Sequence, residues 1–408
     1  MSISQDLYYL EARLLHYSTT SVQLPGSIAH HARTLHTPAP ADKSPDTTPL
    51  RPITHAFDPA ENTPLPHASP FSTIRPISLA QDQRFERANT IYPPSHCIPW
   101  PSLLPAAFQS KYWRQAEAAA TGYLQAINAH HPTLLTHHTA RTKKLVDTAV
   151  SYATNLVPLS SITRMQLLAK TYILLFLHDD AVDTRDSTLT IPPRSAASQR
   201  RNSKAKYLAY DILAQEILAE DPHEGKRLLE ECIAWGSATG ADRPGTFASL
   251  DEYIEHGLKD FGAELILQTV RFSCGDGVGK SGEESQELEP LKALCAKHLL
   301  LTNDLYSYAK EVRAEAEGGE VVLNAVRVLR GLIGGGCDDA LARRLLRLVI
   351  RDLEERMSAE CLRVEQLGHL SEMQMVYARA VIVAVAGNMF FSATSPRYAG
   401  AVEGTKLA

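Results

Sequence analysis

The sequence predicts an all-α protein, because apolar residues recur at spacings of three and four over most of the chain beyond Ala106. Residues that break helices cluster between these periodic segments, and runs typical of β-strands are nearly absent. The pattern therefore indicates a bundle of helices. These are expected at residues 107–129, 140–156, 160–182, 199–219, 223–239, 248–271, 286–313, 319–333, 338–366 and 371–393.

A proline-rich segment precedes the predicted helices. Of the 24 prolines, 16 lie within the first 105 residues, mixed with Ser, Thr, His and Ala. Proline lacks a backbone N–H and blocks helix interiors, so this segment is a poor candidate for regular hydrogen-bonded structure. We expect a flexible, largely disordered N-terminal extension over residues 1–95 and one helical domain over residues 96–408.

Composition and charge argue against several functional classes. With 46 acidic and 41 basic residues, a net charge of −5 and no dense basic run, the chain is not expected to bind nucleic acid. The six cysteines are scattered singly, which is typical of reduced intracellular thiols. The N-terminus lacks a secretory pattern, and uninterrupted apolar runs such as residues 172–177 are too short to cross a bilayer. We expect a soluble cytoplasmic protein without an integral membrane segment.

The first motif with chemical meaning lies at the acidic end of an apolar helix, residues 176–183. Asp179 and Asp183 are four residues apart, so their carboxylates project from one helix face, whereas Asp180 points roughly 100° away. Carboxylates are ligands that Mg²⁺ accepts beside a phosphate-bearing substrate. Three aspartates at a helix C-terminus also oppose its macrodipole, so folding alone does not favour them. Taken alone, the motif is equally explained as a solvated acidic helix end.

The second motif lies on another helix, within residues 301–311. Asn303, Ser307 and Glu311 follow each other at spacings of four and form a stripe of oxygen ligands that drifts by about 40° per step. A carbonyl, a hydroxyl and a carboxylate can share one Mg²⁺ and leave positions for diphosphate oxygens. Lys310 adds a cation beside the stripe. The alternative is a polar face in contact with solvent.

The third motif, Ser395-Pro-Arg-Tyr, follows the last predicted helix. The guanidinium of Arg397 and the hydroxyl of Tyr398 can both donate hydrogen bonds to a diphosphate. An isolated Arg-Tyr pair does not indicate a function, so this motif is informative only in combination with the other two.

Together the three motifs resemble those of class I terpene synthases, in particular the cyclase portion of fungal di- and sesterterpene synthases, over about residues 100–400. The motifs of that family are DDxxD, NDxxSxxxE and a terminal Arg-Tyr pair. They match Asp179, Asp180, Asp183, Asn303, Asp304, Ser307, Glu311, Arg397 and Tyr398. Softer matches are residues 203–206, 250–253 and 322–326.

The resemblance implies the fold and the reaction. We expect a single antiparallel helical bundle of the isoprenoid synthase type, with a cavity closed at one end and the two metal-binding stripes facing each other across its mouth. The enzyme would be a lyase that uses three Mg²⁺ ions. It would ionise a linear polyprenyl diphosphate, cyclise the carbocation to a terpene and release diphosphate. Geranylgeranyl diphosphate is the first choice of substrate and farnesyl diphosphate the second, and the enzyme is expected to be a monomer or a homodimer.

The resemblance also implies roles for individual residues. The expected metal ligands are Asp179, Asp180, Asp183, Asn303, Ser307 and Glu311. The expected catalytic residues are Asp179, Asp183, Arg397 and Tyr398, and the expected substrate-binding residues are Lys310, Arg397, Tyr398, Lys259, Phe176, Phe390 and Phe391. The three phenylalanines could stabilise carbocations through their ring faces, although core packing explains each of them as well.

One position departs from the family pattern. The family usually has an Arg that senses the diphosphate four residues after the Tyr of the softer match at residues 250–253, and this chain has Gly257 there. We expect Lys259 or His256 to take over as a donor, with Lys259 first. On a regular helix these side chains would point about 200° and 100° away from position 257.

Two alternatives remain open. A chain-elongating prenyltransferase would share the fold and the first motif, but it normally carries a second Asp-rich motif where this chain has Asn303, Ser307 and Glu311. A non-ionising relative that only binds diphosphates would be consistent with Gly257. Proton-induced cyclisation is disfavoured because the sequence has no DxDD motif.

Overall fold

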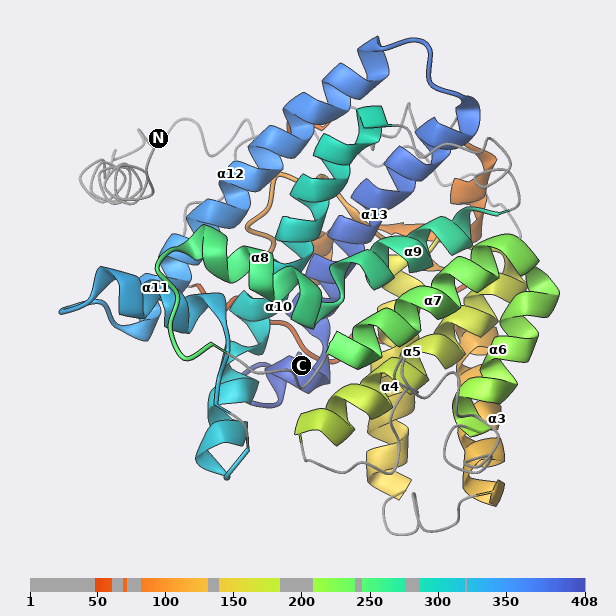
Figure 1. Cartoon of the computed structure of the whole chain (residues 1–408), viewed down its shortest axis with the longest axis horizontal. Helices are drawn as coiled ribbons and strands as arrows, with labels where there is room; N and C mark the ends of the chain where they lie inside the picture. The colour runs from red at the N-terminus through yellow and green to blue at the C-terminus, as the bar shows by residue number, and fades with distance from the viewer. Residues whose placement is uncertain are drawn as a thin grey trace. The chain divides into compact units, whose positions relative to one another are not determined.

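Long helices dominate the chain, as the apolar periodicity predicts (Figure 1). The computed structural model describes residues 48–60, 69–71, 82–130, 139–183, 208–238, 244–275, 286–319 and 321–407, without the side chains of residues 129–130, 139–141, 180–183 and 208. The α-helices are α3 (Trp113–His130), α4 (Thr139–Leu156), α5 (Ile162–Asp183), α6 (Leu208–Glu220), α7 (Pro222–Ala238), α8 (Leu250–Phe261), α9 (Ala263–Cys274), α10 (Glu289–Ala316), α11 (Ala325–Ile333), α12 (Asp339–Gln366), α13 (Glu372–Thr394) and α14 (Pro396–Ala399). Short 3₁₀ turns are η1 (Gln83–Arg87), η2 (Pro93–His96) and η6 (Gln286–Leu288).

The all-α prediction is confirmed, and most expected helices agree with the structure within a few residues. The predicted starts of α12 and α13 agree within one residue with the structure, because capping residues at these positions begin both helices. The carboxylate of Asp338 accepts a hydrogen bond from the backbone N–H of Leu341 at 2.7 Å and so begins α12. Ser371 and Gln374 form a reciprocal capping box that begins α13.

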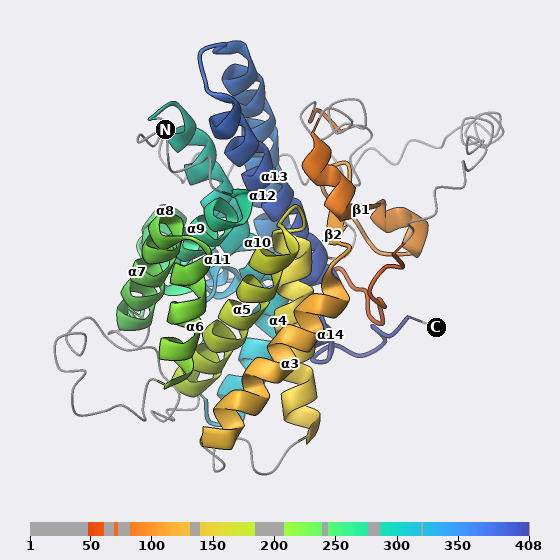
Figure 2. The ribbon, with the colours of Figure 1, turned by 90° about the vertical axis from the view of Figure 1, so that its right-hand side faces the viewer.

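Helix α13 is the centre of the core. Its residues from Val376 to Thr394 are almost all buried, and it packs against α4, α9 and α10 (Figure 2). An apolar surface on all sides is what a helix enclosed by other helices requires. By length and composition the segment Glu372–Ala399 could cross a bilayer, but 89% of its most apolar window is buried within the fold. Its hydrophobicity is therefore explained by its central position.

The predicted helix over residues 248–271 is broken in two. α8 ends at Phe261 and α9 begins at Ala263, and the glycine between them, Gly262, has a φ of 76°. This left-handed conformation favours glycine. A Cβ atom at Gly262 would also lie 2.7 Å from Cδ1 of Trp235, so the close approach of the indole requires glycine too. The break turns the chain beside the cavity described below.

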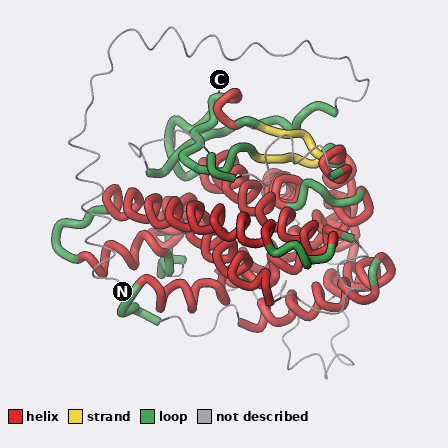
Figure 3. The backbone as a smooth tube through the Cα atoms, turned by 90° about the horizontal axis from the view of Figure 1, so that it is seen from above, coloured by secondary structure: helices red, strands yellow, loops and turns green. Residues whose placement is uncertain are grey.

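A short β-ribbon corrects the expected start of the first helix. Residues 107–110 were expected to be helical, but Ala107–Ser110 forms strand β2 and pairs antiparallel with β1 (Ala88–Ile91). Phe108 is fully buried and packs edge-on against Phe85, with 5.2 Å between ring centroids. Burial of this aromatic side chain outweighs the helical pattern of the following residues. Figure 3 shows the two strands, in yellow, on one side of the helices.

Residues 51–60 also pack on the helices, N-terminal of the expected boundary at residue 96. Arg347 on α12 is fully buried, and its Nη2 donates to Asp58 at 2.7 Å and to the hydroxyl of Tyr306 at 3.1 Å. Phe57 packs edge-on against Tyr306, with 5.3 Å between centroids. Arg51 pairs with Asp147 on α4. Residues 51–408 accordingly form one compact unit.

Candidate active site

A cavity of about 230 Å³ is lined mainly by α5, α8, α9, α10 and the residues that connect α10 to α11. Charged and amide side chains line it at Asp179, Asp260, Asn303, Asp304, Lys310, Glu311 and Arg397, with the hydroxyl of Ser307 among them. Aromatic rings line it at Tyr152, Tyr172, Phe176, Trp235, Tyr253, Phe261 and Tyr398. The cavity thus combines a polar region for an anion with walls that suit a hydrocarbon.

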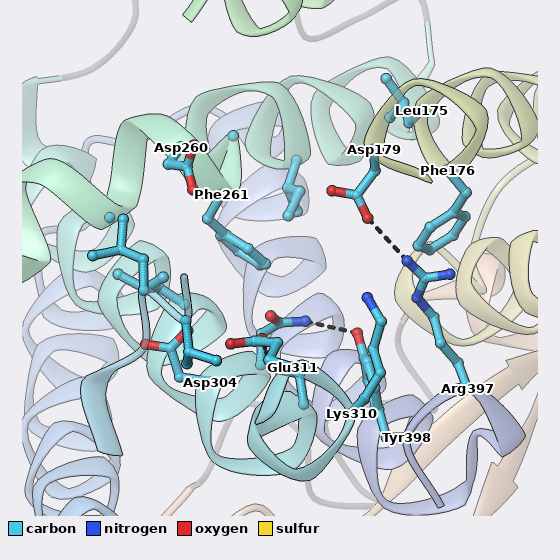
Figure 4. Close-up of a pocket in the computed structure, with 18 of the residues that line it drawn as sticks. Leu175, Phe176, Asp179, Asp260, Phe261, Asp304, Lys310, Glu311, Arg397 and Tyr398 are labelled. Atoms are coloured by element: carbon cyan, nitrogen blue, oxygen red, sulfur yellow. Dashed lines mark hydrogen bonds and ion pairs between the residues drawn. The ribbon is translucent and has the colours of Figure 1, made fainter. Parts of the chain in front are cut away.

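Asp179 and Arg397 meet at one wall of the cavity. Asp179 lies in the last turns of α5, and its Oδ2 accepts a hydrogen bond from Nη2 of Arg397 at 2.9 Å (Figure 4). The guanidinium also lies over the ring of Phe176, 5.1 Å from its centroid. Ser395 caps the short helix α14 that carries Arg397, with Pro396 at its first position, so the local sequence places the guanidinium. The pair offsets the charge of an aspartate at a helix C-terminus.

The remaining aspartates of this motif can be placed only by their backbone. Asp180 and Asp183 belong to the last turn of α5, and their side chains lie outside what the structure describes. Their expected role as metal ligands therefore stays a prediction.

The second motif lines the same cavity from α10. Asn303, Ser307 and Glu311 all contribute to the wall, as the spacing of four predicts. The Nδ2 of Asn303 donates to the hydroxyl oxygen of Tyr398 at 2.8 Å, and the hydroxyl of Ser307 donates to Oε1 of Glu311. Lys310 lines the cavity beside them. The structure therefore brings α5, α10 and α14 together at one site, although they are far apart in the sequence.

The oxygen donors fit a divalent cation. Figure 4 shows Asp179 and Glu311 directed from different walls into the same space. Burial raises the pKa of Glu311 above its ordinary value, and the nearby charge of Asp179 contributes in the same direction. Two carboxylates that repel each other, with an amide and a hydroxyl oxygen beside them, form a hard donor set that suits Mg²⁺. Bound cations would relieve this repulsion.

Asp304, the neighbour of Asn303, has a different environment. Its Oδ2 accepts hydrogen bonds from the hydroxyl of Tyr253 at 2.5 Å and from the backbone N–H of Ala325 at 3.0 Å. Burial raises the pKa of Asp304 well above its ordinary value, and the charge of Glu311 adds to the shift. The carboxyl group joins α8 and the start of α11 to α10, so it supports the cavity wall.

The unusual position 257 also lies in the wall. Gly257 lines the cavity, and a Cβ atom there would lie 3.0 Å from Cδ2 of Leu300. Lys259, the expected replacement donor, is exposed and is not part of the wall, because it projects from another face of α8. His256 packs against Phe247, with 5.7 Å between ring centroids. The cations that the described structure places at this cavity are Arg397 and Lys310.

The three phenylalanines expected to bind substrate lie in different places. Phe176 lines the cavity, whereas Phe390 and Phe391 are buried in the core and do not. Phe391 instead packs against Tyr152 and Tyr398, with centroid distances of 4.8 and 5.8 Å.

Sequence reasoning missed most of the aromatic wall. Tyr172 precedes Phe176 by four residues and Asp179 by seven, and this helical spacing could have placed Tyr172 on the same face of α5. Trp235 gave no such signal, because it reaches the cavity from α7 through its contact with Gly262.

Comparison with known proteins identifies the family. The chain matches the family described as "Terpene synthase family 2, C-terminal metal binding" over residues 170–356. Terpene cyclase 6 of Gibberella fujikuroi is 31% identical over 369 residues, which cover 86% of this chain and 95% of that protein. Terpene cyclase aneC of Aspergillus aculeatus is 28% identical over 394 residues, which cover 88% of this chain and 86% of that protein.

Solved structures show the same fold. Aristolochene synthase from Penicillium roqueforti has a TM-score of 0.51 at 21% identity, over 69% of this chain and 95% of that chain. Germacradien-4-ol synthase from Streptomyces citricolor has a TM-score of 0.52 at 19% identity, over 68% of this chain and 94% of that chain. The three motifs, the helical fold and the extent of the similarity lead to one conclusion. The chain belongs to the terpene synthase family and is a class I terpene cyclase, a lyase that cyclises a prenyl diphosphate.

Proposed function

We propose that this cyclase binds Mg²⁺ between α5 and α10, ionises a linear prenyl diphosphate and folds the resulting carbocation within its aromatic cavity. The observation that carries the proposal is the placement of Asp179, Arg397 and Glu311 on the walls of one cavity. As the family resemblance implies, we assign three ions to the site. When bound, they would stabilise the negative charge of the departing diphosphate.

The protein's own groups would hold the diphosphate. Arg397 and Lys310 supply positive charge at the polar end of the cavity. Burial raises the pKa of Tyr398 to about 12, so its phenol stays protonated. Because Asn303 donates to the phenol oxygen, the phenol hydrogen is left to donate to a diphosphate oxygen. Substrate binding would draw the guanidinium of Arg397 from Asp179 toward the more highly charged ligand.

The apolar walls would guide the hydrocarbon and exclude water. Tyr172 and Tyr152 pack edge to face, with 4.8 Å between centroids, and Phe176 packs on Tyr152 at 5.8 Å. The hydroxyl of Tyr172 pairs with Thr269 at 2.7 Å, and burial raises the pKa of Tyr172, so its ring stays neutral. Faces of neutral rings attract cations, and a dry cavity protects a carbocation from capture by water.

The size of the cavity favours the shorter of the two substrates considered. A volume of about 230 Å³ lies below the roughly 300–1,000 Å³ of most small-molecule sites. The C15 chain of farnesyl diphosphate requires less space than the C20 chain of geranylgeranyl diphosphate. We therefore propose farnesyl diphosphate as the substrate, in place of the C20 substrate that the sequence ranks first.

The test is incubation of the purified protein with Mg²⁺ and each linear diphosphate from C10 to C25, followed by mass spectrometry of the extracted hydrocarbons. We expect a cyclic C15 product that disappears when a chelator removes the metal. A cyclic C20 product as the main product would overturn the choice of substrate.

A second arm of the test addresses the open alternatives. Isopentenyl diphosphate is added to each reaction. Formation of linear diphosphates longer than the one supplied would identify a chain-elongating prenyltransferase. Binding of prenyl diphosphates without diphosphate release, at any chain length, would identify a non-ionising relative.

A further inference from the structure

Asn324 is a buried residue whose side-chain amide has a partner for every hydrogen it can donate. It directly precedes α11, and its Oδ1 accepts a hydrogen bond from the backbone N–H of Val326 at 2.9 Å. Its Nδ2 donates to the backbone oxygen of Asp304 at 2.9 Å and to Oε2 of Glu311 at 3.1 Å. One side chain thus caps α11 and contacts α10 at two points.

The contact with Glu311 fixes one oxygen of a proposed metal ligand. Ser307 donates to Oε1 of Glu311, and Asn324 donates to Oε2, so both oxygens are oriented by neighbours. A glutamate side chain has several rotatable bonds, and a carboxylate held at one oxygen presents the other in a defined direction. Partners of this kind commonly set the affinity of a metal site without touching the metal.

Asn324 also ends the segment that forms part of the cavity wall. Val321, Val322 and Leu323 line the cavity, and Val321 is 72% exposed. The backbone N–H of Val322 donates to Oε1 of Glu315 at 3.1 Å. The segment is therefore anchored to α10 at Glu315 and again, through Asn324, at Glu311.

We propose that Asn324 is a positioning residue for the metal site, which orients Glu311 and ties residues 321–323 to it. The inference rests on the proposed role of Glu311 as a metal ligand. Asparagine fits all three contacts because it carries one acceptor and two donor hydrogens. Aspartate or serine at this position would keep the helix cap but could not supply both donor hydrogens.

The experiment distinguishes the proposed effect of Asn324 on Glu311 from its effect as the cap of α11. Asn324→Ser and Asn324→Asp are compared with Asp338→Ala, which removes the cap of α12 at a residue that does not line the cavity. Two quantities are measured for each protein. One is the Mg²⁺ concentration that gives half-maximal turnover of farnesyl diphosphate, and the other is the rise in Tm on addition of Mg²⁺ and inorganic diphosphate.

We expect both Asn324 variants to need about 10- to 100-fold more Mg²⁺ for half-maximal turnover and to show a smaller rise in Tm. Asp338→Ala should lower the Tm of the free protein but keep the wild-type Mg²⁺ requirement. Combined with Glu311→Gln, Asn324→Ser should add little to the Mg²⁺ requirement of the single Glu311 variant, because both changes act on one carboxylate.

Three outcomes would overturn the inference: a wild-type Mg²⁺ requirement in both Asn324 variants, full additivity with Glu311→Gln, or loss of helical circular dichroism in both Asn324 variants. The last would show that the amide serves folding. If the wild-type protein itself shows neither turnover nor a Tm rise with Mg²⁺ and diphosphate, the proposed function fails, and the inference fails with it.

Discussion

Arg397 and Asp179 form an ion pair of 2.9 Å between α14 and the end of α5, and both side chains line the cavity. One residue is a proposed diphosphate donor and the other a proposed metal ligand. Because the guanidinium is 10% exposed and the carboxylate 44% exposed, Arg397 is the more firmly enclosed member of the pair. The ion pair therefore marks the point where metal and diphosphate would meet.

Arg397→Ala should lower kcat/KM with farnesyl diphosphate by about 100- to 1,000-fold, since it removes one charged donor from an enclosed site. Steady-state measurement of diphosphate release checks this value. Arg330→Ala is the matched control, because Arg330 pairs with Asp339 at a surface where its side chain is 47% exposed. Equal activity of the two variants would remove Arg397 from the proposed site.

Asp179→Asn and Glu311→Gln should each abolish most activity while helical circular dichroism stays unchanged. Each substitution keeps the shape of the side chain but weakens a ligand for Mg²⁺. The effect of Asp179→Asn should exceed that of Asp180→Asn, because successive positions of a regular helix are rotated by about 100° and Asp179 is the one that lines the cavity. Normal turnover in both Asp179→Asn and Glu311→Gln would refute the metal assignment.

Lys310→Ala and Lys259→Ala should differ sharply. Lys310 lines the cavity, and loss of a charged contact in an enclosed site costs about 2 to 4 kcal/mol, which corresponds to a roughly 30- to 1,000-fold lower rate. Lys259 is exposed outside the cavity wall, so its substitution should leave the rate within about twofold. Single-turnover kinetics of diphosphate release measures both. The reverse order would restore Lys259 as the substitute for the missing arginine at position 257.

Removal of residues 1–50 should leave the Tm and the product unchanged, because the compact unit begins at Arg51. Asp58→Ala should instead lower the free energy of unfolding by about 3 kcal/mol, since it leaves the buried guanidinium of Arg347 without its carboxylate. Chemical denaturation of the two proteins gives the comparison. An active, helical protein that lacks residues 1–95 would show that the contacts of Phe57 and Asp58 are dispensable.

The helices could be predicted because their signals are local. Apolar spacing and caps such as Ser371 act within a few residues, and so do the spacings that place Asn303, Ser307 and Glu311 on one face. The break at Gly262 was hidden because it depends on Trp235, which lies 27 positions earlier in the chain. Which face of a helix lies toward the cavity likewise depends on tertiary packing, so the sequence alone does not distinguish the exposed Lys259 from the cavity-lining Tyr172.

Neighbours within a motif can also serve different purposes. Asn303 and Asp304 are adjacent, yet Asn303 contacts Tyr398 whereas Asp304 contacts Tyr253 and Ala325. Their side chains point about 100° apart on α10, and only the packing of α8 and α11 decides what each one meets. The contact between Asn324 and Glu311 is non-local in the same way.

The most direct test of the account is a crystal structure of the protein with Mg²⁺ and inorganic diphosphate. We expect metal ions bound by Asp179 on one side and by Asn303, Ser307 and Glu311 on the other, with diphosphate oxygens in contact with Arg397 and Lys310. Metal bound at only one of the two helices, or diphosphate bound away from Arg397, would contradict it.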